Sequence, residues 1–228
     1  MTKPAVAILL ACSLVSCATS SAGYERAAGT ANRTQSHREN LVDLRDQVGL
    51  TLDSLRTLSE SPDVLPRSNR ETFETFAREL RNLEHDAESA RKSYGRMDAD
   101  AGRFFGGWSE DTAAIVDADL RQRAEDRRVA LQASYAELSH AQRDTDVALA
   151  GFVRRLDDLR VYLEHDLTAA GIASAAKPIA DALAEGALIQ QSLSDLAHRA
   201  DAAQAGLEPL KAQAPSQTPS QTIGREVR

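Results

Sequence analysis

Apolar side chains recur at intervals of three and four along most of this chain, and that spacing is typical of one face of a helix. The clearest stretch begins at Phe73 and ends at Phe104. Its repeating positions are Phe73, Phe76, Leu80, Leu83, Ala87, Ala90, Tyr94, Met97, Ala101 and Phe104. Nearly every residue between them is charged or polar. The stretch therefore predicts a heptad helix that packs through a single seam against another helix.

Three further stretches carry the same spacing, at residues 41–58, 131–163 and 179–210. Leu and Ala supply most of their apolar positions, and both residue types favour helices. Together the four stretches predict an all-α fold, an elongated antiparallel helical bundle or coiled coil of about four helices that spans residues 37–213. The order in which the helices pair is left open.

Proline and glycine mark the expected connections. Pro62 and Pro66 end the first helix, because proline removes a backbone donor and disfavours helical geometry before it. The pair Gly106–Gly107 predicts a hairpin, after which Ser109 could cap a third helix that continues to about residue 167. Gly171 predicts the next turn.

Four positions depart from the plain apolar repeat. Gln142 and Thr145 are polar residues in the third seam, where they either set the helix register or mark a wet spot. Pro178 suits the first turn of the last helix, because its missing donor costs nothing there. Gly186 marks a stutter in the spacing of that helix.

Composition narrows the functional classes. Acidic residues outnumber basic ones, 34 to 27, and the formal net charge of -7 makes nucleic acid an unfavourable partner. Both cysteines, Cys12 and Cys17, precede the helical region. The folded body can therefore hold no internal disulfide and no cysteine metal site. No cofactor is expected.

The first residues are typical of a signal peptide that covers residues 1–16. Lys3 precedes the short apolar run 5–11, which is too short to span a bilayer. Leu14–Cys17 resembles the lipobox of bacterial lipoproteins, in which cleavage before the cysteine accompanies lipid attachment to its sulfur. A competing string ends at Cys12, but it leaves a shorter apolar region. We expect lipidation at Cys17.

Lipid attachment implies an address in the cell envelope. Ala18 stands where an aspartate would signal retention in the inner membrane, so the outer membrane is favoured, with the protein facing the periplasm. Residues 17–36 are rich in small and polar side chains and predict a flexible tether that holds the body off the bilayer. Residues 214–228 carry little apolar material and predict a disordered tail.

Candidate chemistry is sparse. The dense group Glu164–His165–Asp166 could form a metal or proton-transfer site between helices, which would suit a ligand-binding or hydrolytic lipoprotein. Adjacent residues on a helix point in different directions, however, so a solvated or helix-ending role is favoured. No phosphate-binding loop or nucleophile elbow is present in the sequence.

Phe104, Phe105 and Trp108 gather three of the ten aromatic residues near the expected hairpin. Structurally, they would plug the tip of the bundle. Functionally, they could form a contact patch for a partner or a membrane, because Trp and Phe are common in binding hot spots.

Three motifs carry a resemblance to a known family: the segment 37–43, Phe104–Phe105 shortly before Trp108, and the segment 163–169. With these motifs the chain resembles a family of uncharacterised Gram-negative coiled-coil lipoproteins, Domain of Unknown Function 2959. The resemblance implies an envelope compartment and a helical body, and it implies no catalytic residue or ligand.

The leading hypothesis from the sequence is a non-enzymatic envelope lipoprotein. Its helical body would act as a scaffold or interaction module for another envelope protein or for a second copy of itself. Membrane attachment would come from the lipid anchor on Cys17.

Overall fold

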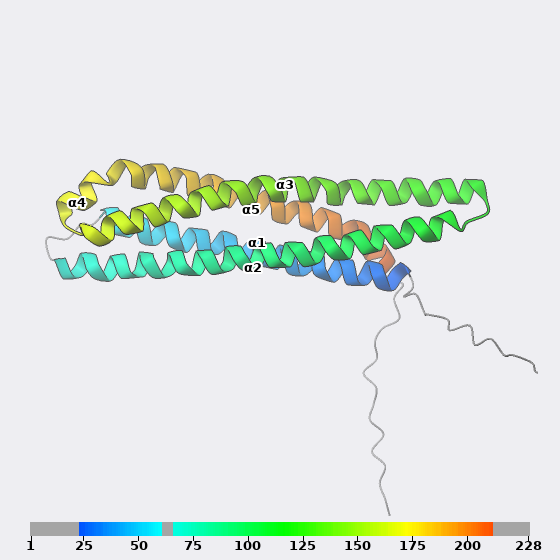
Figure 1. Cartoon of the computed structure of the whole chain (residues 1–228), viewed down its shortest axis with the longest axis horizontal. Coiled ribbons are helices and arrows are strands. Elements are labelled where there is room, and N and C mark those ends of the chain that lie inside the picture. Colours follow the sequence, from blue (N-terminus) through cyan, green and yellow to red (C-terminus); the bar gives the residue numbers. More distant parts are fainter. Residues whose placement is uncertain (1–22, 61–65, 212–228) are drawn as a thin grey trace, which may run out of the picture.

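The computed structural model describes residues 23–60 and 66–211, and its regular elements are helices (Figure 1). Four are long: α1 (Gly23–Glu60), α2 (Pro66–Ala113), α3 (Ala118–His165) and α5 (Ala176–Lys211). A short helix, α4 (Ala169–Ser174), lies between α3 and α5. Within these described ranges there is no strand. The predicted all-α fold is confirmed.

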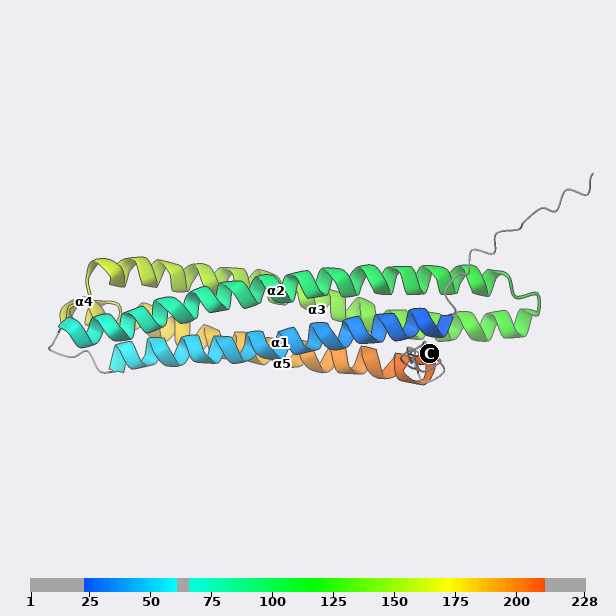
Figure 2. The same cartoon turned by 90° about the horizontal axis from the view of Figure 1, so that it is seen from below.

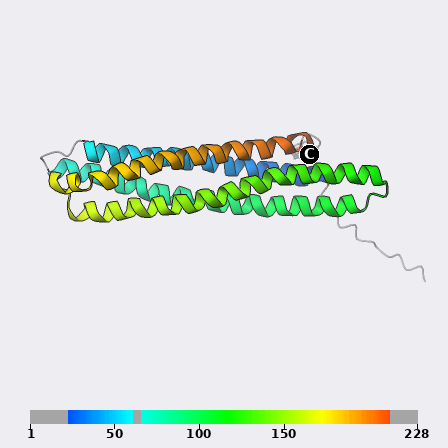
Figure 3. The ribbon, with the colours of Figure 1, turned by 90° about the horizontal axis from the view of Figure 1, so that it is seen from above.

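The four long helices form one elongated antiparallel bundle. α1 packs against α2 and α5, and α3 packs against the same two helices (Figures 2 and 3). At a rise of about 1.5 Å per residue, the helices of 48 residues are roughly 70 Å long. α1 begins and α5 ends at the same end of the bundle, and the connection between α2 and α3 projects beyond both (Figures 1 and 2).

The core runs along the inner edges of all four helices. The predicted seams are confirmed, because most of their apolar positions are buried. The largest fully buried side chains are Phe76, Phe152, Leu41, Leu44, Leu55, Leu58, Leu80, Leu83, Met97, Leu138, Leu156 and Leu163. None of the helices described here is long and apolar enough to cross a membrane.

The predicted tether over residues 17–36 is wrong for most of its length, because α1 already begins at Gly23. Its first turns bury Ala27, Ala31, Thr30 and Thr34 at the same three-and-four spacing as the later leucines. Because alanine is small and threonine is polar, these residues were not recognised in the sequence as an apolar repeat. The two hydroxyls are satisfied within the helix: Thr30 donates to the carbonyl of the residue four before it, at 3.0 Å, and Thr34 does the same at 2.9 Å.

The predicted hairpin at Gly106–Gly107 is also wrong, because α2 continues through it to Ala113. Gly107 instead makes room for α1: a Cβ there would lie 3.2 Å from Nε of Arg26. The chain turns only after α2 ends. Asp117, rather than Ser109, caps α3, where its Oδ1 accepts from the backbone N–H of Leu120 at 2.9 Å.

The predicted turn around Gly171 contains α4. A Cβ at Gly171 would lie 2.5 Å from the backbone oxygen of Asp166, so this close approach requires glycine. Pro178 lies in the first turn of α5, as predicted. Gly186, where the seam stutters, faces α1: a Cβ there would lie 2.5 Å from the buried side chain of Leu52. The stutter therefore marks a close approach between α5 and α1.

Candidate functional site

The aromatic group predicted from the sequence packs into the core near the end of the bundle where α1 begins. Phe104 and Phe105 are buried, and their ring centroids are 5.0 Å apart. Trp108, which is partly buried, meets Phe104 edge-on at 5.4 Å. Phe105 meets Tyr135 of α3 at the same separation. The rings form a hydrophobic plug, but not at the tip of a hairpin as predicted, because α2 continues past them to Ala113. Their role as a partner contact stays a prediction.

A cavity of about 380 Å³ opens beside this plug. Its apolar wall consists of Tyr24, Phe104, Trp108, Ile115, Ala124 and Leu210. These residues come from the first turn of α1, the end of α2 and the residues after it, the start of α3 and the end of α5. The volume lies in the range of small-molecule sites, about 300–1,000 Å³, and such sites are mostly apolar with a few polar groups.

Gly23 and three polar residues complete the cavity lining. Arg26 of α1 forms an ion pair with Asp111 of α2, at 2.5 Å between Nη2 and Oδ2. The Asp111 side chain is 64% exposed, which places this pair at the solvent side. Thr112 is only 4% exposed, and its Oγ1 has no hydrogen-bond partner among the described residues. A buried hydroxyl without a partner is unusual, because the loss of its hydration is not compensated.

A second polar feature, which sequence reasoning missed, lies inside the bundle. His37 of α1 is fully buried, with Nδ1 2.9 Å from Oγ of Ser93 on α2 and Nε2 3.0 Å from Oε1 of Gln142 on α3. Gln142 in turn donates from its Nε2 to Oδ1 of Asp146 at 2.9 Å. Its Oε1 therefore accepts from His37 Nε2–H, which leaves Nδ1 of the neutral ring as an acceptor. The single Ser93 hydroxyl proton is then shared between this Nδ1 and the backbone oxygen of Ala90, at 2.8 Å.

This polar layer joins three helices at one height. Of the two interpretations of Gln142 and Thr145, the structure favours register over a wet spot, because both residues are buried and Gln142 bonds across to α1. A shift of α1 against α2 and α3 would leave buried polar atoms of His37 and Gln142 without partners. The sequence signal was present, since His37 stands at the three-and-four spacing between Thr34 and Leu41.

Burial also sets the protonation of these groups. It lowers the pKa of His37 to about 4, while the hydrogen bond to Gln142 opposes this shift. Burial raises the pKa of the Asp146 carboxyl above its usual range. It raises the pKa of Tyr135 to about 12, although the phenol has a partner at 2.7 Å, the Thr34 hydroxyl. At neutral pH the layer therefore holds a neutral imidazole, and the phenol that pairs with Thr34, one turn before His37 on α1, is neutral as well.

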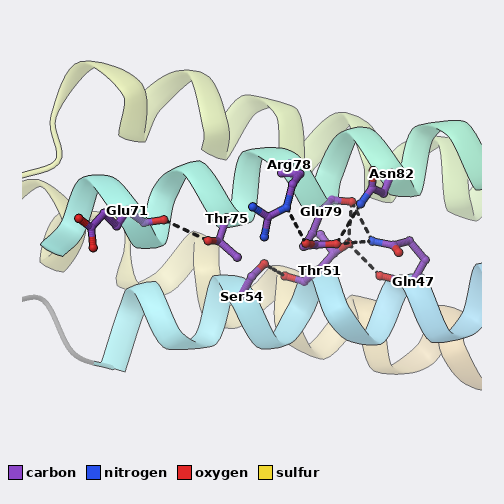
Figure 4. Close-up of polar contacts among 8 residues, drawn as sticks. All are labelled: Gln47, Thr51, Ser54, Glu71, Thr75, Arg78, Glu79 and Asn82. Atoms are coloured by element: carbon purple, nitrogen blue, oxygen red, sulfur yellow. Dashed lines mark hydrogen bonds and ion pairs between the residues drawn. The ribbon is translucent and has the colours of Figure 1, made fainter.

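A third polar cluster ties α1 to α2 near the other end of the bundle (Figure 4). Glu79 accepts hydrogen bonds from Gln47 and Asn82 at 3.1 Å each and from Arg78 at 3.2 Å. The bond from Gln47 is the largest cause that lowers the pKa of the Glu79 carboxyl. Thr51 donates to the backbone oxygen of Glu79 at 3.2 Å. These contacts hold an ionised carboxylate between α1 and α2 and so stabilise the packing of the two helices.

The group Glu164–His165–Asp166 does not converge on a cavity. Glu164 and His165 are exposed at the end of α3, and Glu164 pairs with Arg160 one turn earlier at 3.0 Å. Asp166 accepts from the hydroxyl and the backbone N–H of Thr168, at 2.6 and 3.1 Å, and these bonds lower the pKa of its carboxyl. The helix-ending interpretation therefore describes this group.

The remaining predictions from the sequence concern metal binding and lipidation. Among the residues that the structure describes, no group of three or more His, Cys, Asp or Glu side chains could hold a metal ion. Cys17, with the signal peptide over residues 1–16 and the tail over 214–228, lies outside the described residues. Lipidation at Cys17 stays a prediction.

Comparison with known proteins finds one family. The model of a protein of unknown function, DUF2959, matches residues 17–205. No curated protein and no solved structure matches the chain.

Proposed function

The chain belongs to DUF2959, a family of proteins of unknown function, and we propose that it is a non-enzymatic lipoprotein of the cell envelope. Its anchor is a lipid on Cys17, and its helical body faces the periplasm as a scaffold or interaction module. Ala18 after the cysteine favours the outer membrane. The partner is another envelope protein or a second copy of the chain.

The short distance along the sequence between Cys17 and the start of α1 carries this proposal. Only residues 18–22 separate the lipobox cysteine from Gly23, where α1 begins at one end of the bundle. Six residue steps span at most about 20 Å. A lipid on Cys17 would hold that end of the bundle near the bilayer, and helices of roughly 70 Å could reach far from it. The family match also starts at Cys17.

The outer surface of the bundle supports a role in binding. Large apolar side chains stand exposed on it, among them Val147 on α3, at 76% exposure, and Leu188 on α5, at 65%. Val116, on the projecting connection between α2 and α3, is 95% exposed. Isolated exposed apolar residues are common on soluble proteins, but they also provide positions from which a partner can be captured without disturbing the core.

Substitution of the two cysteines tests the anchor. We expect Cys17→Ser to abolish labelling by a palmitate analogue in cells and to release the protein from the membrane fraction. Cys12→Ser is the matched control, because it removes the competing lipobox cysteine and leaves the predicted one. Labelling that survives Cys17→Ser, or that disappears only with Cys12→Ser, would contradict anchoring at Cys17.

Photo-cross-linking from the bundle surface tests the interaction role. A photoreactive amino acid is placed at Val147 in one variant and at Leu188 in another. One of the two positions should reproducibly capture a single envelope protein or a second copy of the chain. The two positions lie on different helices and control for each other. Capture of unrelated proteins alone, at equal yield from the two positions, would argue against a specific scaffold.

A further inference from the structure

The cavity beside Trp108 has the features of a site for an amphiphile with one apolar chain. Its wall is aromatic and aliphatic, with Phe104, Trp108 and Ile115 from the end of α2 and the residues after it, and Leu210 from the end of α5. Displacement of water from such an apolar wall by a hydrocarbon chain is favourable, because both apolar surfaces are removed from water. The volume of about 380 Å³ is near the lower end of ligand sites, which favours a single-chain lipid over one with two chains.

The polar groups of the cavity indicate the head group. Thr112 lines the cavity and carries a buried hydroxyl whose Oγ1 lacks a hydrogen-bond partner, so a ligand oxygen would satisfy it. Arg26 lines the same cavity and brings a guanidinium to its solvent side, where its partner Asp111 is largely exposed. Asp111 also lines the cavity, so a ligand carboxylate would share the Arg26 guanidinium with it. The planar fork of a guanidinium can bind two carboxylates, and together with the Thr112 hydroxyl it favours a carboxylate over an ammonium head group.

We propose that this cavity binds one free fatty acid. The alkyl chain lies against Phe104, Trp108 and Leu210, and the carboxylate is directed toward the Thr112 hydroxyl and the Arg26 guanidinium. The site lies at the end of the bundle where α1 begins, the end that a lipid on Cys17 would hold near a bilayer. The fatty-acid site itself does not require that lipid.

Trp108 is the sole tryptophan of the chain, so its fluorescence reports on the cavity directly. The test uses the full chain with Cys17→Ser, which cannot carry a lipid there, and laurate as the probe. Laurate should shift the emission of Trp108 to shorter wavelength, reduce its quenching by acrylamide, and saturate at one molecule per chain. Dodecyltrimethylammonium, with the same chain length and the opposite charge, should bind more weakly.

Two substitutions assign the signal to the cavity. Thr112→Val keeps the shape of the side chain, removes the hydroxyl, and should weaken laurate binding about tenfold, the loss expected for one hydrogen bond to a charged group. Thr75→Val is the matched control at a distance from the cavity and should leave laurate binding unchanged. Ala124→Phe adds a ring to the cavity wall and should block binding, and circular dichroism establishes that it remains helical.

Three results would overturn the proposal. One is a folded chain in which Trp108 does not respond to laurate. Another is equal laurate affinity in Thr112→Val and Thr75→Val. The third is a response to phosphatidylglycerol vesicles alone, which would indicate contact with a lipid surface. Because the protein in this test has no Cys17, failure here leaves the anchor proposal untouched, and failure to label Cys17 in cells leaves the laurate result untouched.

Discussion

Acidification should destabilise this bundle through His37. The imidazole is neutral in the folded protein, because burial lowers its pKa to about 4. In the unfolded chain the same group takes up a proton below its ordinary value of about 6.5. Between these two values the unfolded state binds more protons than the folded state. Stability is therefore lost as pH falls from about 6.5 to about 4 and changes no further through this group below that range.

The size of the effect follows from the shift in pKa. A shift of one pKa unit corresponds to about 1.4 kcal/mol, so the full loss attributable to His37 is roughly 3 kcal/mol. At about pH 5 the loss is roughly 2 kcal/mol, because only part of the window has been crossed. This is a sizeable share of the about 5–15 kcal/mol by which proteins are normally stable.

Urea denaturation followed by circular dichroism, at about pH 7 and about pH 5, measures the loss. His37→Gln removes the titrating group, so the variant should lose about 2 kcal/mol less than the wild type over this interval. Leu41→Ala, one turn along α1 and equally buried, serves as the control. It should cost about 2–5 kcal/mol at both pH values and leave the pH dependence unchanged. An identical loss in the wild type and in His37→Gln would refute the reasoning.

Three other outcomes can be measured by the same denaturation method. Because burial raises the pKa of Tyr135 to about 12, stability should fall as pH rises from about 10 to about 12, by about 1.4 kcal/mol at pH 11, and Tyr135→Phe should abolish this loss. Gly186→Ala should destabilise the protein by about 1–3 kcal/mol through a clash with α1, whereas Gly151→Ala, whose new Cβ meets nothing within 4 Å, should stabilise it by about 0.5–1 kcal/mol. Asp117→Ala should cost about 0.5–2 kcal/mol as the loss of a helix cap, and an equal cost for Ser109→Ala would contradict the observed start of α3.

Local patterns were sufficient to predict the four long helices over most of their length, together with their buried edges. The spacing from Phe73 to Phe104 identifies the inner edge of α2, because apolar residues three and four apart share one helix face wherever the helix lies. The end of α1 at Glu60 and the start of α2 at Pro66 are equally local, because proline acts on its immediate neighbours. Part of the candidate site was found in the same way, since Phe104 and Trp108 stand out as a cluster of aromatic residues in the sequence.

The remaining features depend on residues that are distant in sequence. His37 is recognisable as part of a polar layer only once Ser93 and Gln142, 56 and 105 residues away, lie beside it. Gly107 was predicted as part of a turn because paired glycines are common in turns, and its role inside α2 is visible only once Arg26 of α1 lies beside it. Periodicity shows which edge of a helix is buried and carries no information about which helix covers it. The tertiary structure alone therefore decided the pairing order, the polar layer and the cavity.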